Sequence, residues 1–225
     1  CKTANSANIS SGRFDNNLIT GEFSTTGAYK GYTLKLDGIA LTLGNFSILS
    51  AHYYDNYQFR GLAGIPATAA TEYTTGTGYG NCYGDYNPEN MLKNKGLLTG
   101  TLTAQFNPDR TISADYLYSV IYYDNKGRVV QTKSNNHLEG TEEEYIAYNF
   151  TGQPTKQLHI HTRSAGGAGT QKEEYTYRYD HAGRLKETRH RINESENIMA
   201  ILNHYDELGR LQSTSRNVYQ LSVNP

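Results

Sequence analysis

Short runs in which apolar and polar residues alternate recur along the chain. Residues 32–36 (YTLKL) and 39–43 (IALTL) alternate in this way in the first half, and residues 175–179 (YTYRY) in the second. A period of two is typical of half-buried β-strands, and no sustained run shows the 3.6-residue apolar period of an amphipathic helix. Asp37 and Gly38 separate the first two runs and favour a tight turn between them. The pattern predicts an all-β fold.

The second half contains a repeated motif that opens with Tyr-Asp and ends with Gly-Arg and an aliphatic residue. It occurs at residues 123–129 (YDNKGRV), 179–185 (YDHAGRL) and 205–211 (YDELGRL), with a weaker copy at 148–154 (YNFTGQP). Successive copies begin 25, 31 and 26 residues apart. Self-similarity at such a spacing is typical of repeat architectures, in which each unit needs its neighbours to bury its apolar face.

Each copy has the chemistry of a tight hairpin turn. Asp or Asn at the second position accepts hydrogen bonds from amides further along the turn, and glycine supplies the left-handed conformation that closes a bulged hairpin. Such a turn pairs each opening tyrosine with the residue after the arginine, and each aspartate with the arginine. Ion pairs of that kind contribute a few tenths of a kcal/mol, up to about 1 kcal/mol. The predicted turn residues are Asp124, Gly127, Arg128, Asn149, Gly152, Asp180, Gly183, Arg184, Asp206, Gly209 and Arg210.

The weaker copy departs from the motif at its last two positions. Gln153 replaces the arginine, and Pro154 replaces the aliphatic residue. Proline has no amide hydrogen to donate to a neighbouring strand. We therefore expect Pro154 at a sheet edge, at a bulge, or with its nitrogen facing no partner.

The chain divides into two regions of different composition. Residues 1–110 are rich in Gly, Thr, Asn and Ser, and we predict a β-rich N-terminal segment there, with a loop over residues 74–85 and one helical turn at residues 87–90 (NPEN). Residues 111–225 form the repeat hairpin region. Since open strands at the ends of a sheet invite pairing, we expect the N-terminal segment to cap one end, or the edges to self-associate.

Composition and charge narrow the classes of partner. The chain has 20 Tyr, 22 Gly and no Trp, and tyrosine suits half-buried strands whose hydroxyls stay wet. A net charge of -1 gives no basic footprint for nucleic acid or anionic lipid, and no apolar run approaches the about 20 residues of a membrane span. Cys1 and Cys82 allow at most one disulfide. Cys1 fits either the lipid-bearing first residue of a processed bacterial lipoprotein or an artificial boundary of the chain.

Several side chains have catalytic or metal-binding chemistry, and an ordinary structural role is favoured for each. His159 and His161 point to one side of a strand and could bind a metal with His181, His190 or His204, but an isolated His-x-His is a weak signal. The acidic runs 142–144 and 173–174 could supply an acid and base pair or a calcium site, but both sit beside polar residues typical of a solvated linker face. The repeated aspartates are explained as turn formers. No cofactor motif is present, so no cofactor is predicted.

The repeat resembles the YD repeat of bacterial RHS (rearrangement hotspot) proteins and of their teneurin relatives, and residues 123–210 are particularly similar to Bacteroides-type RHS-repeat proteins. The resemblance covers roughly residues 110–225, whereas residues 53–57 (YYDNY) share only the opening Tyr-Asp and lack the glycine. It implies an extended, strongly twisted antiparallel sheet of hairpins. In long members of the family such a sheet closes into a shell around a toxin or other cargo.

The resemblance also implies a function. It is that of a non-enzymatic structural or binding module of a bacterial cell-surface or secreted protein, which encapsulates a toxin or mediates intercellular interaction. Its partners would be other RHS-repeat segments, or further copies joined through sheet edges. Four hairpins cannot enclose a cavity and no Asp-Pro-rich cleavage segment follows Leu211, so a fragment or shortened member is implied. The alternatives are a stand-alone carbohydrate-binding protein with tyrosine-rich faces and a polysaccharide-active enzyme with paired carboxylates.

Overall fold

The computed structural model of the chain describes residues 19–36, 39–40, 48–80, 96–195 and 197–220. These residues form strands and connecting turns, and no helix occurs among them. The strands are β1 (Ile19–Phe23), β2 (Tyr32–Leu36), β3 (Ile39–Ala40), β4 (Ser50–Tyr54), β5 (Leu98–Phe106), β6 (Ile112–Tyr123), β7 (Val129–Asn135), β8 (Thr141–Tyr148), β9 (Pro154–Arg163), β10 (Gly169–Tyr179), β11 (Leu185–Ile192), β12 (Asn197–Tyr205) and β13 (Leu211–Gln220).

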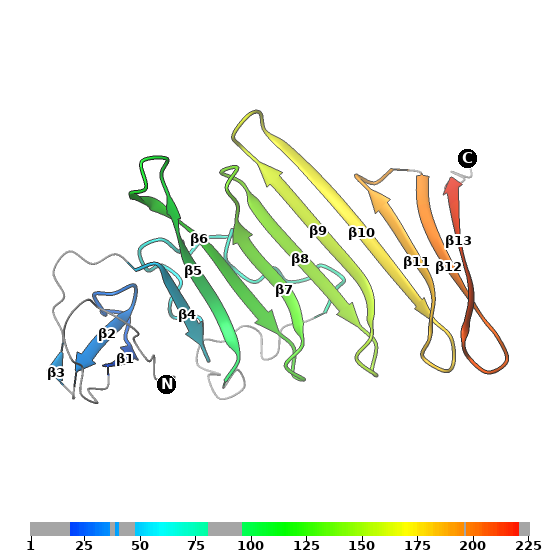
Figure 1. Cartoon of the computed structure of the whole chain (residues 1–225), viewed down its shortest axis with the longest axis horizontal. Coiled ribbons are helices and arrows are strands. Elements are labelled where there is room, and N and C mark those ends of the chain that lie inside the picture. Colours follow the sequence, from blue (N-terminus) through cyan, green and yellow to red (C-terminus); the bar gives the residue numbers. More distant parts are fainter. Residues whose placement is uncertain (1–18, 37–38, 41–47, 81–95, 196, 221–225) are drawn as a thin grey trace.

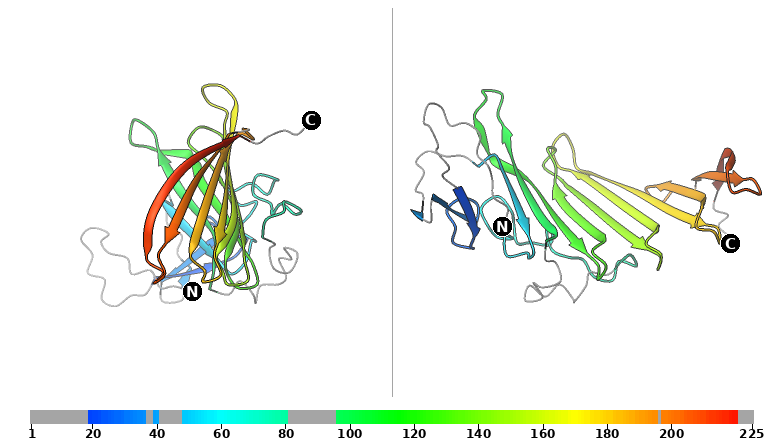
Figure 2. Two further views of the ribbon diagram at one scale, coloured as in Figure 1. Left: turned by 90° about the vertical axis from the view of Figure 1, so that its right-hand side faces the viewer. Right: turned by 60° about the horizontal axis from the view of Figure 1, so that its bottom comes forward.

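The described strands form two antiparallel sheets. A ten-stranded sheet runs from β4 to β13 with every strand beside its neighbours in sequence, and a three-stranded sheet contains β1, β2 and β3 (Figure 1). The strand direction turns steadily from β4 to β13, so the long sheet is strongly twisted (Figure 2). The prediction of an all-β fold built on an extended twisted antiparallel sheet is confirmed.

Predictions about the first half are tested only in part. The alternating run at residues 32–36 is β2, and the described part of the run at residues 39–43 is β3. Residues 74–80 contain neither strand nor helix, as expected of a loop. Cys1, Cys82 and the expected helical turn at residues 87–90 lie outside the described residues.

The strand register of the repeat follows the turn chemistry. The opening tyrosines pair with the residues after the arginines, as Tyr123 with Val129, Tyr179 with Leu185 and Tyr205 with Leu211, each beside a register shift. Pro154 pairs with Tyr148 beside such a shift, which confirms the expectation of a bulge at the proline. The missing amide of Pro154 is thereby kept out of the regular ladder.

One face of the long sheet is covered by the segment that follows β4. Residues 55–80 cross β5 to β8, and Figure 2 shows this cyan segment on one side of the sheet. Phe59 and Ile65 of the segment are fully buried, and the ring of Tyr57 stacks on that of Tyr122 with centroids 4.7 Å apart. We call this side, which carries Tyr122 and Gln131, the covered face.

Tyrosine hydroxyls satisfy backbone groups inside this core. Tyr57 donates to the carbonyl of Ile121 at 2.9 Å, and Tyr122 donates to the carbonyl of Thr71. A buried carbonyl without a donor costs free energy, and irregular segments leave many such carbonyls unpaired. The tyrosine-rich composition therefore lets an irregular segment pack on a sheet.

The three-stranded sheet contacts the long sheet at β4. The ring of Tyr53 has its centroid 6.0 Å from that of Phe23 and 5.8 Å from that of Tyr32. Tyr53 also donates to the carbonyl of Lys30 at 2.9 Å, and Tyr32 donates to the carbonyl of His52 on β4. The N-terminal strands thus lie against one end of the long sheet (Figure 1).

A buried lysine joins the covering segment to the sheet. Lys133 on β7 is 3% exposed, and its Nζ lies 3.1 Å from the carbonyl of Ala69, 2.8 Å from Thr74 Oγ1 and 3.4 Å from Glu143 Oε2. An ammonium group is tolerated at such depth only when it is paired and hydrogen-bonded. Lys133 therefore ties residues 69–74 to β7 and β8.

We expect Lys133→Ala to destabilise the fold by about 3–5 kcal/mol, because it removes the cation paired with Glu143 and leaves the Ala69 carbonyl without its donor. Urea denaturation followed by circular dichroism measures the change. Lys172→Ala is the control, since the Lys172 side chain is 44% exposed and its ion pair with Glu194 should contribute about 1 kcal/mol or less. Equal losses in the two variants would contradict a locking role for Lys133.

Candidate functional site

The motif aspartates organise the hairpin turns. Asp124 Oδ1 accepts the amides of Lys126 at 2.9 Å and Arg128 at 3.0 Å, and its Oδ2 accepts Arg128 Nε at 2.7 Å. Gly127 has φ 73° and donates to the Asp124 carbonyl at 3.1 Å. Burial alone would raise the pKa of Asp124, but the hydrogen bonds and charge of Arg128 outweigh it and lower the pKa. The carboxylate is therefore a structural acceptor.

The other copies repeat this geometry. In the turns opened by Asp180 and Asp206 the carboxylate accepts the equivalent two amides at 2.8–3.0 Å and the arginine Nε at 2.7 Å. Asn149 also serves as an acceptor, because the backbone amide of Gln153 donates to its Oδ1 at 2.9 Å. The closing glycines are left-handed at Gly152 (φ 92°), Gly183 (φ 77°) and Gly209 (φ 79°). All the predicted turn residues therefore lie at hairpin turns, with Arg128, Arg184 and Arg210 each paired to its aspartate.

β4 and β5 form a further hairpin of this kind, but the covering segment separates the two strands in the sequence. Tyr54 pairs with Leu98 beside a register shift, as Tyr123 does with Val129, and Asp55 donates its amide to the Leu97 carbonyl at 3.1 Å. Gly96 donates its amide to Asp55 Oδ1 at 2.5 Å. The Tyr-Asp of residues 54–55 is therefore completed by a glycine that follows only after residues 56–95. Sequence reasoning missed this because the closing residues are far away along the chain.

Neighbouring hairpins are joined by the motif tyrosines. Each tyrosine hydroxyl donates to the carbonyl of the residue that ends the preceding turn. The bonds are Tyr123 to Leu98 at 2.6 Å, Tyr148 to Val129 at 2.9 Å, Tyr179 to Pro154 at 2.9 Å and Tyr205 to Leu185 at 2.8 Å. One tyrosine thus fixes its own turn by its backbone and the adjacent hairpin by its hydroxyl.

At each of these junctions, the residue that precedes the accepting carbonyl in the sequence extends towards the turn of the next hairpin. Arg128 lies over the ring of Tyr148 at 4.6 Å, and Arg184 lies over that of Tyr205 at 4.8 Å. Where arginine is replaced, Gln153 donates to the carbonyl of Gly183 at 2.7 Å. Each hairpin therefore accepts the same tyrosine hydrogen bond from its successor, whereas the second contact varies with the residue before the accepting carbonyl, and both contacts arise at the turn end of the strands.

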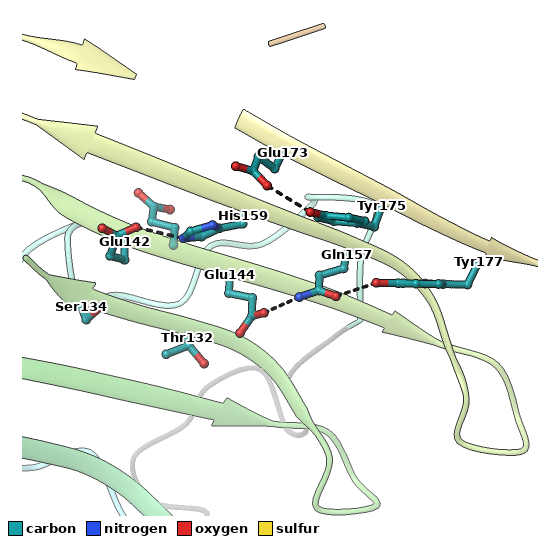
Figure 3. Close-up of a pocket in the computed structure, with 10 residues that line it drawn as sticks. Thr132, Ser134, Glu142, Glu144, Gln157, His159, Glu173, Tyr175 and Tyr177 are labelled. Atoms are coloured by element: carbon teal, nitrogen blue, oxygen red, sulfur yellow. Dashed lines mark hydrogen bonds and ion pairs between the residues drawn. The ribbon is translucent and has the colours of Figure 1, made fainter. Parts of the chain in front are cut away.

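The opposite side of the sheet carries a polar groove of about 400 Å³. We call this side the groove face. Cross-strand register aligns Thr132, Glu144, His159 and Glu173 in one row over β7 to β10. Figure 3 shows these side chains with Glu142, Gln157, Tyr175 and Tyr177, which also line the groove.

Glu142 is the most heavily hydrogen-bonded acid of the groove face. Its Oε2 lies 2.9 Å from His159 Nε2, its Oε1 lies 2.5 Å from His161 Nδ1, and Asn136 donates to Oε1 at 2.9 Å. Burial would raise the pKa of Glu142, but the hydrogen bonds from Asn136, His161 and His159 outweigh it and lower the pKa. Both histidines are thus directed at one carboxylate.

The other groove acids are also held by donors. Tyr177 donates to Gln157 Oε1 at 3.0 Å, and Gln157 donates to Glu144 Oε1 at 2.6 Å. Tyr175 donates to Glu173 Oε2 at 3.1 Å and stacks on His190 with ring centroids 4.4 Å apart. Burial would raise the pKa of Glu173, but the hydrogen bonds from Tyr175 and Gln171, with His190 and His159 nearby, outweigh it and lower the pKa.

Residues 142–144 closely follow the turn at residues 136–140, as expected, but both acidic runs are in half-buried strands rather than in solvated linkers. Residues 142–144 are in β8 and residues 173–174 are in β10, and the side chains of Glu142 and Glu173 are less than a third exposed. The reason is pairing between hairpins, which places acids of β8 and β10 beside histidines of β9. Polar residues at every second position of these strands could have indicated a polar sheet face. That pattern does not show which strands lie beside one another.

The histidines do not assemble a metal site within the described residues. No group of three His, Cys, Asp or Glu side chains there could hold a metal ion. Nor do the described residues include a helix long and apolar enough to cross a membrane. His159 and His161 do share one side of β9, as the alternation predicts, but their partner is Glu142.

Comparison of the chain with models of known protein families and with curated proteins finds no match.

We expect Asp124→Ala to destabilise the fold by about 1–2 kcal/mol, because two amides and one guanidinium lose their acceptor. Asp124→Asn should cost less, since Asn149 serves in the equivalent turn. Urea denaturation of the two variants gives the comparison. Equal losses would show that the charge of Asp124, rather than its acceptance of amides, maintains the turn.

We expect Glu142→Gln to weaken the dependence of stability on pH in the acid range. The folded-state pKa of Glu142 lies below its ordinary value of 4.5, so its ionised form stabilises the fold above that pH. This contribution is lost as the pH falls through the folded-state pKa. Urea denaturation midpoints can be measured from about pH 3 to about pH 7, which spans the titration of carboxylates. As the pH is lowered, these midpoints should fall less steeply in Glu142→Gln than in the unmodified chain.

Glu194→Gln is the control for that titration, because the Glu194 side chain is 66% exposed. Its profile should follow that of the unmodified chain. A Glu142→Gln profile that is parallel to both would contradict the assignment of a lowered pKa to Glu142.

Proposed function

We propose that the chain is a non-enzymatic structural module of an RHS-type bacterial cell-surface or secreted protein. Its hairpins contribute wall to a β-shell that encloses a toxin or other cargo, or that mediates contact between cells. The observation that carries this proposal is the repeated junction, in which a motif tyrosine donates to the carbonyl ending the preceding turn. A junction with identical chemistry at each step extends a wall by simple addition.

A structural role is supported by where the recurring residues lie. The motif side chains form the contacts of the turns and junctions. Arg184 donates to Asp180, and Tyr179 donates to the Pro154 carbonyl. A repeat selected for ligand binding would be expected to direct its invariant positions towards the ligand. Here they maintain the sheet.

A catalytic role for the groove is disfavoured by the electrostatics of its acids. A glycosidase of the usual kind needs a carboxyl group that stays protonated as general acid, with a raised pKa. The pKa values of Glu142 and Glu173 are lowered by their hydrogen-bond donors. The acids do share one groove, which Glu143 and Glu144 also line, rather than being scattered over turns.

Carbohydrate binding is the second candidate, favoured by the groove face. Tyr175 and Tyr177 line the groove with nearly parallel rings, 8° apart, beside the amide of Gln157 and the carboxylates. Aromatic faces with adjacent hydrogen-bonding groups suit sugar rings. Such binding is compatible with a wall whose outer or inner face carries the groove.

Two measurements on the full chain test the surface location and carbohydrate binding. The structural role predicts that protease treatment of intact producing cells removes the protein, and that a glycan array gives no signal above background. Carbohydrate binding predicts a signal that is lost in Tyr175→Ala. Phe150→Ala is the control, because Phe150 is 88% exposed at a turn outside the groove. Protein that resists protease until the cells are lysed would contradict the surface location.

A further inference from the structure

A cleft of about 1020 Å³ lies on the covered face, at the end of the strands opposite the motif turns. One wall is formed by residues 61–68 of the covering segment, and the rest by the adjoining parts of β5 and β6 and by residues 135–141, which join β7 to β8. The turns that follow β5 and β7 project at the same end of the sheet (Figure 1). None of the described residues lines both this cleft and the groove of the opposite face, so the two cavities are separate.

Tyr118 lines the cleft with a hydroxyl that has no acceptor. The residue is only 8% exposed and lies on the same side of β6 as Tyr116 and Tyr122. Tyr122 donates to the carbonyl of Thr71, and Tyr116 likewise donates to a backbone carbonyl. Within the part of the chain that the structure describes, Tyr118 forms a hydrogen bond through its amide, to Asn135 Oδ1, and none through its hydroxyl. A buried hydroxyl without a partner costs free energy, which an acceptor placed in the cleft would recover.

Two further polar side chains reach the cleft through an irregularity of β5 and β6. The pairing of Ala104 with Tyr116 is followed by a register shift, which leaves Gln105 opposite residues 113–115. Bulges of this kind turn side chains out of the regular alternation and are common beside binding sites. Gln105 and Asp115 both line the cleft, and neither side chain has a hydrogen bond or ion pair to any described residue.

The charge around the cleft is negative. Asp115 and Glu139 line it together with His137, and the described lining residues include neither lysine nor arginine. Glu139 also forms no ion pair within the described ranges. Unpaired carboxylates on one concave surface attract a cationic group. The cleft therefore offers a hydrogen-bond donor in its floor and negative charge around it.

We propose that the cleft binds an extended basic peptide segment of a partner protein. A backbone carbonyl of the segment accepts the Tyr118 hydroxyl, and a lysine or arginine side chain of the segment lies between Asp115 and Glu139. The aliphatic stem of that side chain packs on Leu62 and Pro66, which are half-buried in the wall of the cleft.

The occupant is argued from the way this chain already holds irregular backbone on its sheet. Tyr57 and Tyr122 each donate to a backbone carbonyl across the interface with the covering segment. Tyr118 has the same position on the sheet face and lacks the carbonyl. A polyamine brings no acceptor for this hydroxyl, and a neutral sugar brings no charge to the two carboxylates, whereas a basic peptide brings both. The inference goes beyond the proposed function and does not depend on it, because it uses neither the motif turns nor the groove.

Stability measurements test whether the Tyr118 hydroxyl is available. Tyr118→Phe should leave the urea midpoint of the free chain unchanged, because no hydrogen bond is lost. Tyr122→Phe is the matched control and should lower the midpoint, since it leaves the Thr71 carbonyl without its donor. An equal fall in both variants would show that Tyr118 already has an acceptor in the chain, and would overturn the inference.

Binding is measured on the full chain by fluorescence anisotropy with a short fluorescein-labelled peptide in which lysine alternates with serine. A peptide with glutamate in place of lysine is the matched probe and should not bind. Tyr118→Phe and Asp115→Asn should each raise the Kd of the lysine peptide about threefold to tenfold, as expected for the loss of one hydrogen bond or ion pair. Glu144→Gln makes the same change of charge in the groove and should leave the Kd unaltered.

Three results of the binding experiments would also overturn the inference. The first is a lysine peptide that does not bind, or that binds no better than the glutamate peptide. The second is an affinity that falls in Glu144→Gln but not in Asp115→Asn, which would place the peptide in the groove. The third is a glycan-array signal that Tyr118→Phe abolishes, which would make a sugar the occupant. The protease measurement and the Tyr175→Ala variant do not involve this cleft, so the proposed function is tested independently.

Discussion

The bond from a motif tyrosine to the carbonyl of the preceding hairpin is the constraint on which the long sheet depends. A two-stranded hairpin is marginally stable in water, so each unit must be held by its neighbours. Strand pairing alone leaves register weakly specified, and a slip of one residue would exchange the covered and groove faces. The hydroxyl of Tyr179, which reaches the Pro154 carbonyl, fixes that register at the turn end.

The same side chain explains the unusual composition. A tyrosine supplies apolar area for packing and a donor for a carbonyl that would otherwise lie unpaired. This is why an irregular segment can cover the sheet, as Tyr57 and Tyr122 show by donating to backbone carbonyls across the interface. Phenylalanine would give the area without the donor, and an irregular covering segment would then leave buried carbonyls unsatisfied.

The sequence was sufficient for features that are local along the chain. The turn from Asp180 to Arg184 is determined by contacts within a few residues, so its register and its left-handed glycine could be predicted. The hairpin closed by Gly96 could not, because its two halves are separated by residues 56–95. The groove could not be predicted either, since the approach of Glu142 to His159 depends on pairing between different hairpins. Local chemistry predicts the units, whereas their neighbours follow only from the assembled sheet.

The repeat also explains where specific chemistry can arise on this sheet. At the turn ends each motif tyrosine donates to the carbonyl that ends the preceding turn, so side chains there are constrained. At the opposite ends the connections vary, and β9 and β10, of 10 and 11 residues, project beyond their neighbours (Figure 1). Their lengths account for the wider spacing of 31 residues between the copies that begin at Tyr148 and Tyr179. Glu142, His159 and His161 lie towards that end, where a change of side chain leaves the junctions intact, so a sheet of this design can acquire a binding surface without altering its repeat.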